Sequence, residues 1–354
     1  MTINVVNAYP DDVPNRYGGG HWKAIHASTL ALEKFSVNII DLPLPTDLEQ
    51  AKPILENCLT DLSEFDINIV IFNYNFWPKL AKLIKFTFPS VSVFVRVLSP
   101  TAFHYWHTSD LKFVPTYRNF RILYGFLRLL MFDVQSKQSV DKLLTISEWD
   151  RRYYWNMIPG KSKVFNLPYY CPWPFLRSDS VPKPWHERKN QIVCIPGGRD
   201  PIGISQITNF LFFARTVNLS QLKSNWSFAL SPGIYRNDDL FKDIDPVVFL
   251  ERLDEPWDLL CSVKALAIIT HLGFGTKTTI IDALTAGCHV LIDRKFARRL
   301  PVNVRTLCCE VDISKPTQFI EIMNRLENEP QTHSLNTELM SETHLVLDKA
   351  LNFT

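Results

Sequence analysis

The sequence contains little glycine, with 12 residues in a chain of 354. This is about half of the usual ~7 per cent. Nine of the twelve fall in three short stretches, at 18–20, 197–203 and 273–287. When a chain that is poor in glycine clusters its glycines, a side chain would not be tolerated at those places. The three stretches are therefore the first candidates for a binding function.

Other features are missing as well. No apolar run approaches the ~18–20 residues of a membrane span, and the seven cysteines include no CxxC pair. The N-terminus lacks the basic start and apolar core of a secretory signal. We therefore expect a cytoplasmic protein with reduced cysteines. The net charge of +2 does not indicate a nucleic-acid partner, and the content of 46% hydrophobic residues excludes a disordered chain.

Strand and helix signals alternate along the chain. Continuous Val/Ile/Phe runs at 67–73 and 91–98 predict strands that are buried on both faces of a parallel sheet. Helical segments at 78–86 and 117–137 lie between or after such runs, which predicts a doubly wound α/β domain. The same alternation of strand and helix signals begins again near residue 191, and the length of the chain favours two domains of similar size.

A proline-rich stretch separates the two halves. Five prolines fall between Pro168 and Pro184. Because proline fixes φ and lacks an N–H donor, we expect neither helix nor sheet interior there. The predicted units are an N-terminal Rossmann-like domain, a linker, a C-terminal Rossmann-like domain and a closing helical segment, at 1–168, 169–190, 191–330 and 331–354.

Each glycine cluster follows a predicted strand and precedes a predicted helix. In an open parallel sheet this position faces the crevice where ligands bind, and a helix N-terminus favours phosphate. Two domains with such loops predict a phosphate-bearing ligand between them, with simple tight turns as the alternative. The dinucleotide fingerprint GxGxxG is absent, and the string at 275–278, GTKT, lacks the glycine spacing of a P-loop.

The segment at 273–292, GFGTKTTIIDALTAGCHVLI, resembles the signature of retaining glycosyltransferases of the family 4 type. That signature is a glycine-rich turn, a helix with an acidic residue followed by alanine, and a strand. Further similar segments keep the family's order, with YGGG at 17–20, LTISEW at 144–149 and IPGGR at 195–199. The resemblance covers nearly the whole chain. It implies the GT-B fold, in which two Rossmann-like domains face a cleft, an acceptor-side domain first and a nucleotide-sugar-binding domain second.

The resemblance also implies a set of site residues. Arg199 and Lys277 would be catalytic cations at the donor diphosphate, where negative charge grows as the glycosidic bond breaks. His104, or His107 in the same loop after the strand at 91–98, would lie near the reacting carbon. Asp282 would accept hydrogen bonds from the ribose hydroxyls. The remaining residues of the implied donor site are Gly19, Gly20, Gly198, Gly275 and Thr276.

The implied reaction moves a sugar from a nucleotide sugar to a glycan or lipid-linked acceptor, with retention and without a metal or other cofactor. The DxD-like triplet at 243–245 is interpreted as turn chemistry beside Pro246. Two alternatives stay open. One is a sugar transferase that acts on modified DNA bases. The other is a catalytically silent binding module, because the family's lysine after Arg199 and its first glutamate are missing.

The stretch from 67 to 132 contains eight basic residues and one acidic residue, Asp110. Two predicted helices in it mix those bases with aromatic residues and leucines. This composition predicts attachment to an anionic membrane surface. A nucleic-acid acceptor and a solvated basic face over a core-packed stripe are the alternatives. The expected location is the cytoplasm, with peripheral attachment at the inner face of the membrane.

Overall fold

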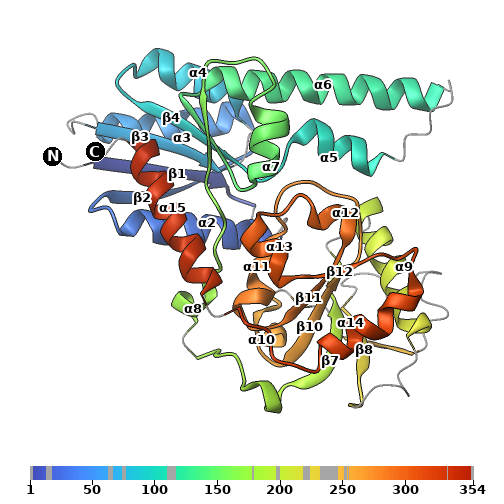
Figure 1. Cartoon of the computed structure of the whole chain (residues 1–354). Coiled ribbons are helices and arrows are strands. Elements are labelled where there is room, and N and C mark those ends of the chain that lie inside the picture. The colour runs from blue at the N-terminus through green and yellow to red at the C-terminus, as the bar shows by residue number, and fades with distance from the viewer. Residues whose placement is uncertain are drawn as a thin grey trace.

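The structure is a computed structural model that describes residues 3–12, 18–62, 67–73, 77–109, 117–177, 179–196, 200–217, 224–231, 246–250, 253, 255–332 and 334–351. Within these ranges the strands form two parallel sheets of six strands each, with helices packed around them (Figure 1). The prediction of two doubly wound α/β domains is confirmed.

The first sheet belongs to the N-terminal half and has the order β2-β1-β3-β4-β5-β6. Its central strands are runs of Val, Ile and Phe, and Val5 pairs with Ile39 on one side and with Ile69 on the other. The strand order reverses between β1 and β3, which places a ligand crevice at the carboxyl ends of the strands. The strands are β1 (Ile3–Pro10), β2 (Asn38–Leu44), β3 (Ile67–Asn73), β4 (Ser92–Val97), β5 (Lys142–Thr145) and β6 (Lys163–Asn166).

The helices of this half correct the prediction in three places. α2 already begins at Gly18, so the first glycine cluster lies inside the helix and not in a turn before it. α3 is not predicted; Pro53 lies within it, and Asp47 caps its N-terminus. α5 replaces a predicted loop. The helices are α2 (Gly18–Glu33), α3 (Leu48–Asp61), α4 (Pro78–Thr87), α5 (Thr101–Thr108), α6 (Tyr117–Ser139) and α7 (Glu148–Asp150), which a π-helical turn (Arg151–Trp155) follows.

The second sheet has the order β12-β11-β10-β7-β8-β9, so its strand order reverses between β7 and β10. Every residue of β10 and β11 is buried, as expected for strands that are covered on both faces. The strands are β7 (Lys189–Cys194), β8 (Ser227–Leu230), β9 (Val247–Phe249), β10 (Val263–Ile268), β11 (His289–Asp293) and β12 (Cys309–Val311). The helices are α9 (Pro201–Thr216), α10 (Trp257–Leu260), α11 (Thr278–Thr285), α12 (Arg294–Ala297), α13 (Val302–Leu307) and α14 (Phe319–Arg325), with a 3-10 turn (Pro316–Gln318) before α14.

The proline-rich segment contains two short helices, so the expectation that it has no helix is wrong. α8 (Trp173–Leu176) follows Pro172 and has a proline in its first turn. A proline costs nothing there because the first N–H groups of a helix have no intrahelical acceptor. The second helix is a 3-10 turn (Trp185–Glu187) that begins directly after Pro184.

The last helix, α15 (Leu335–Leu351), lies against α2 and β6 of the N-terminal half and against α11 of the C-terminal half (Figure 1). Thr343 donates a hydrogen bond to the carbonyl of Pro168 at 2.8 Å, and Lys142 donates to the carbonyl of Ala350. One apolar cluster runs through both halves here and includes Ala27, Leu284 and Leu347. We call this side of the interface the hinge side.

Candidate active site

A cavity of about 320 Å³ lies between the two halves, and we call it the cleft cavity. Its walls come from the carboxyl ends of strands in both sheets and from the helices that follow them. This is the crevice position that open α/β sheets use for ligands. The N-terminal half contributes Leu98, Ser99, His104 and Ile146, and the C-terminal half contributes Ile195, Asp200, Ile202, Gly203, Gln206, Ile268, Gly273, Phe274, Thr276, Lys277, Thr278 and Thr279.

Lys277 supplies a cation to this cavity. Its ammonium donates to the Oε1 atom of Gln206 at 3.3 Å and lies 5.8 Å from the ring centroid of Phe296. No salt bridge to a carboxylate holds it among the described residues. Burial lowers the pKa of Lys277 to about 8, although Cys194 and Asp200 act in the opposite direction. The group is therefore a desolvated cation that a bound anion would stabilise.

Two helix N-termini face the cleft cavity, and they differ. The N-terminus of α9 is already satisfied, because Asp200 accepts a hydrogen bond from the N–H of Gly203 at 2.7 Å. α11 begins after Lys277 and has no side-chain cap. The N–H of Ile280 donates to the carbonyl of Lys277 at 3.0 Å, so a phosphate there would be favoured by the positive end of the helix dipole and by the N–H groups ahead of Ile280. The cation of Lys277 and the start of α11 thus form one anion-binding corner.

Thr276 and His104 complete this region from opposite sides. The Oγ1 atom of Thr276 is buried and has no hydrogen-bond partner among the described residues, which is costly unless a ligand uses it. His104 lies on α5 and its side chain is exposed toward the cavity. Its surroundings desolvate the ring and lower its pKa, with Asp200 raising it and Lys277 lowering it further. The lowered pKa favours the neutral form of the imidazole.

Gly275 lies at a close contact between the two halves. Its φ of +73° is a conformation that side chains disfavour. A Cβ atom there would lie 2.5 Å from the carbonyl oxygen of Leu98, which belongs to the other half. Gly275 therefore permits contact between the two backbones. The implied role of this glycine at the phosphates is not tested by that contact.

Phe274, which lines the cleft cavity, makes aromatic contacts with the N-terminal half. The ring of Phe274 lies 5.3 Å from that of Phe103 and 5.6 Å from that of Trp149, and the guanidinium of Arg299 lies 5.0 Å from it. Nearby, Asp150 is buried, and desolvation raises the pKa of its carboxyl to about 7 despite the nearby Gly275 N–H and Arg299. The sequence gives no signal for these groups, because residues from both halves create their surroundings.

Asp282 lies elsewhere than the other predicted residues. It is 0% exposed, does not line the cleft cavity, and accepts hydrogen bonds from the ammonium of Lys23 and from the Tyr169 hydroxyl at 2.7 Å. Lys23 is 1% exposed and lies 3.9 Å from Glu255, whose pKa burial raises to about 7. These groups join α2, the linker and α11 on the hinge side. The implied ribose contact of Asp282 stays a prediction, and this geometry gives it no support.

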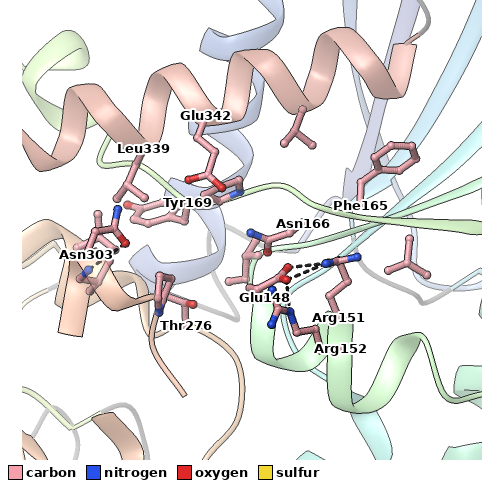
Figure 2. Close-up of a pocket in the computed structure, with 17 residues that line it drawn as sticks. Glu148, Arg151, Arg152, Phe165, Asn166, Tyr169, Thr276, Asn303, Leu339 and Glu342 are labelled. Atoms are coloured by element: carbon pink, nitrogen blue, oxygen red, sulfur yellow. Dashed lines mark hydrogen bonds and ion pairs between the residues drawn. The ribbon is translucent and has the colours of Figure 1, made fainter. Parts of the chain in front are cut away.

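A second cavity, of about 480 Å³, lies on the hinge side beneath α15, and we call it the hinge cavity (Figure 2). Figure 2 shows Glu342 pointing into it from α15 and Glu148 joined to two arginines. Arg151 binds both oxygens of Glu148, at 2.6 and 2.7 Å, and Arg152 binds one of them at 2.5 Å. Both arginines of this cavity thus share one carboxylate partner, whereas Lys277 in the cleft cavity has no carboxylate partner in the described part of the chain.

The remaining predicted residues can be placed only in part. Gly19 and Gly20 lie in the first turn of α2. Gly198, Arg199 and the triplet at 243–245 lie outside the described residues, although Ile195 and Asp200 on either side of the arginine line the cleft cavity. The described residues contain no cluster of three or more His, Cys, Asp or Glu side chains that could hold a metal ion. No described helix is long and apolar enough to cross a membrane.

No protein-family model and no curated protein sequence matches the chain. Solved structures do match it along nearly its whole length. Sucrose-phosphate synthase from Thermosynechococcus elongatus has 12% identity and a TM-score of 0.58, over 99% of this chain and 96% of that chain. A UDP-forming α,α-trehalose-phosphate synthase from Burkholderia xenovorans, in complex with glucose-6-phosphate, has 12% identity and a TM-score of 0.56, over 99% of each chain.

A third match is an α-glucosyltransferase in complex with UDP and a 13-mer DNA, with 13% identity and a TM-score of 0.55, over 98% of this chain and 95% of that chain. These neighbours are GT-B glycosyltransferases, and the likeness extends through both domains and the cleft between them. The GT-B fold predicted from the sequence is therefore confirmed. At these identities the likeness establishes the fold alone, and the resemblance to family 4 stays a prediction.

Proposed function

We propose that the chain is a glycosyltransferase that moves a sugar from a nucleotide-sugar donor to a glycan or lipid-linked acceptor, with retention. The supporting observation is the anion-binding corner of Lys277 and the α11 N-terminus, inside the cleft of a whole-chain GT-B fold. UDP-bound and UDP-forming enzymes among the neighbours support a nucleoside diphosphate as the ligand.

In the proposed reaction, the groups that line the cleft contact the donor and stabilise the charge that forms on it. The bond between the anomeric carbon and a diphosphate oxygen breaks, a bond from that carbon to an acceptor hydroxyl oxygen forms, and the hydroxyl proton passes to the departing diphosphate. Negative charge grows on the departing diphosphate, where Lys277 and the α11 N–H groups stabilise it without reorganising. Thr276 gives its buried hydroxyl to the donor, and His104 faces the sugar from the acceptor side as a neutral hydrogen-bonding group. Arg199 remains a proposed second cation. As predicted, the reaction is proposed without a metal.

A sugar transferase acting on modified DNA bases is the second candidate. The neighbour that holds UDP and DNA favours it, and so does the basic stretch of the N-terminal half. Its reaction would use the same cleft and donor, so the two candidates differ only in the acceptor.

A thermal-shift screen of nucleoside diphosphates and their sugars tests the proposal. A donor at 100 times its dissociation constant should stabilise the chain by ~2.7 kcal/mol. Release of free nucleoside diphosphate from the stabilising sugar nucleotide then separates an enzyme from a silent binding module. If no nucleotide shifts the melting temperature, the proposal is wrong.

A further inference from the structure

The N-terminal half carries an unusual outer surface that the proposed reaction does not use. α6 lies along the side of this half that faces away from the C-terminal half, with its first part extending beyond the sheet (Figure 1). α4 packs beside it. We call the exposed residues of these two helices the outer face.

An apolar stripe runs along the exposed side of α6. Phe120, Tyr124, Leu127 and Met131 are all exposed, at spacings of three and four residues that place them on one helical face. Leu123 lies beside them and is exposed as well. Single exposed apolar residues are ordinary on a protein surface, but a continuous row of five on one helix marks an interaction site.

The stripe continues into a basic groove. Gln135 and Gln138 follow Met131 at the same helical spacing and line a groove of about 410 Å³ between α4 and α6. The other wall is basic, with Lys79, Lys82 and Lys85. Lys85 pairs with Asp141, whereas Lys79 and Lys82 have no ion-pair partner among the described residues.

The charge on the outer face has one sign. Arg121 and Arg128 flank the stripe and are exposed. Phe86, which is 85% exposed, lies on the same face of α4 as Lys79 and Lys82. The only carboxylate in the sequences of the two helices is Asp133, which is 0% exposed and accepts a hydrogen bond from Tyr154. Asp141, which follows α6, pairs with Lys85, and the face otherwise combines exposed apolar side chains with cations.

We propose that the outer face binds the surface of an anionic phospholipid bilayer. The apolar stripe enters the boundary between headgroups and acyl chains, and the basic groove receives lipid phosphates. Duplex nucleic acid fits less well, because it offers no apolar phase for Phe86, Tyr124 and Leu127. The inference does not depend on the proposed reaction, since it concerns binding by a surface outside the cleft.

The position of α5 would make such binding useful for a membrane acceptor. α5 packs between α6 and α9 and carries His104. Phe103 on α5 contacts Phe126 on the inner side of α6. One helix layer thus separates the outer face from the cleft cavity.

Vesicle co-sedimentation tests the proposal with the whole chain. We expect binding to vesicles of phosphatidylcholine with phosphatidylglycerol, and at least tenfold weaker binding to phosphatidylcholine alone. Lys79→Gln with Lys82→Gln should weaken binding about 30-fold, at ~1 kcal/mol for each lysine. Leu123→Ser with Leu127→Ser should weaken it about tenfold or more.

Matched controls separate this surface from general effects. Lys161→Gln with Lys315→Gln removes two exposed lysines elsewhere, and Val302→Ser with Leu345→Ser removes two exposed apolar side chains. Both controls should bind like the parent. Equal loss in the controls, no preference for anionic vesicles, or stronger binding to a duplex DNA probe that the outer-face variants lose would overturn the proposal. So would a dimer in light scattering that Leu123→Ser with Leu127→Ser dissociates.

Discussion

The hinge side and the cleft side of the domain interface differ in whether a buried charge has a partner of opposite charge. On the hinge side, Lys23 and Asp282 neutralise each other at 1% and 0% exposure, and Tyr169 satisfies the second carboxylate oxygen. On the cleft side, Lys277 is desolvated without a carboxylate partner among the described residues, and α11 begins without a side-chain cap. Both sides use the same helix, α11.

The difference shows how one interface combines stability with chemistry. Removing one partner of a buried ion pair is strongly destabilising, because the charge of the other partner is then buried without an opposite charge. An unpaired buried cation instead destabilises the empty protein and makes an arriving anion more favourable. The ion pair on the hinge side therefore fixes the two domains in position. The cation in the cleft is left to bind an anionic ligand.

The largest expected effect is on the hinge side. Lys23→Met should lower the free energy of unfolding by about 3–5 kcal/mol, since it leaves the carboxylate of Asp282 buried and unpaired. Urea denaturation followed by circular dichroism measures this loss. The control is Lys85→Met, which breaks the partly exposed pair with Asp141 and should cost about 0–1 kcal/mol. Equal losses in the two variants would remove the distinction between buried and surface pairs.

The next effect separates the cleft from the hinge. Lys277→Met should leave the folded protein as stable as the parent or more stable, because it removes a desolvated cation. The stabilisation of ~2.7 kcal/mol expected from saturating UDP should vanish. Differential scanning calorimetry with and without UDP measures both quantities. A variant that keeps the full UDP shift would show that the anion-binding corner is not the nucleotide site.

Gly275 tests how closely the two domains approach. Gly275→Ala should destabilise the protein by about 1–3 kcal/mol more than Gly273→Ala. Both glycines have positive φ, but a Cβ atom at 273 would meet only Ile202 and Phe296 side-chain atoms, at 3.6 Å or more. The pair therefore isolates the contact with the Leu98 carbonyl. Equal melting temperatures of the two variants would argue against that contact.

Lys277 should also give a pH dependence, with opposite signs for UDP affinity and for stability. UDP affinity should fall by up to tenfold per pH unit above pH 8, as Lys277 loses its proton in the free protein. Without ligand, the unfolded chain keeps this proton up to the ordinary pKa of 10.5, so the contribution of Lys277 to stability rises between pH 8 and 10.5. Titration calorimetry and urea denaturation across this range should give these opposite trends in the parent and neither in Lys277→Met.

The features that depend on local sequence pattern and on the order of elements along the chain could be predicted from the sequence. Buried Val/Ile runs separated by helices gave two parallel sheets, and strand ends brought His104, Thr276 and Lys277 to one cavity. Long-range partners could not be predicted. The carboxylate of Asp282 is held by Lys23, which is 259 residues away in the chain, and no local signal in the helix 278–285 indicates that pairing. The helix α3 was not predicted, and it contains Pro53, which is unfavourable in a helix interior.

The central claim is that a nucleoside diphosphate binds in the cleft cavity and not in the larger hinge cavity. Hydrogen–deuterium exchange of the whole chain, with and without saturating UDP, tests this directly. We expect protection at 195–207 and 272–281, and none at 163–169 or 335–346. Protection confined to those hinge segments would contradict it.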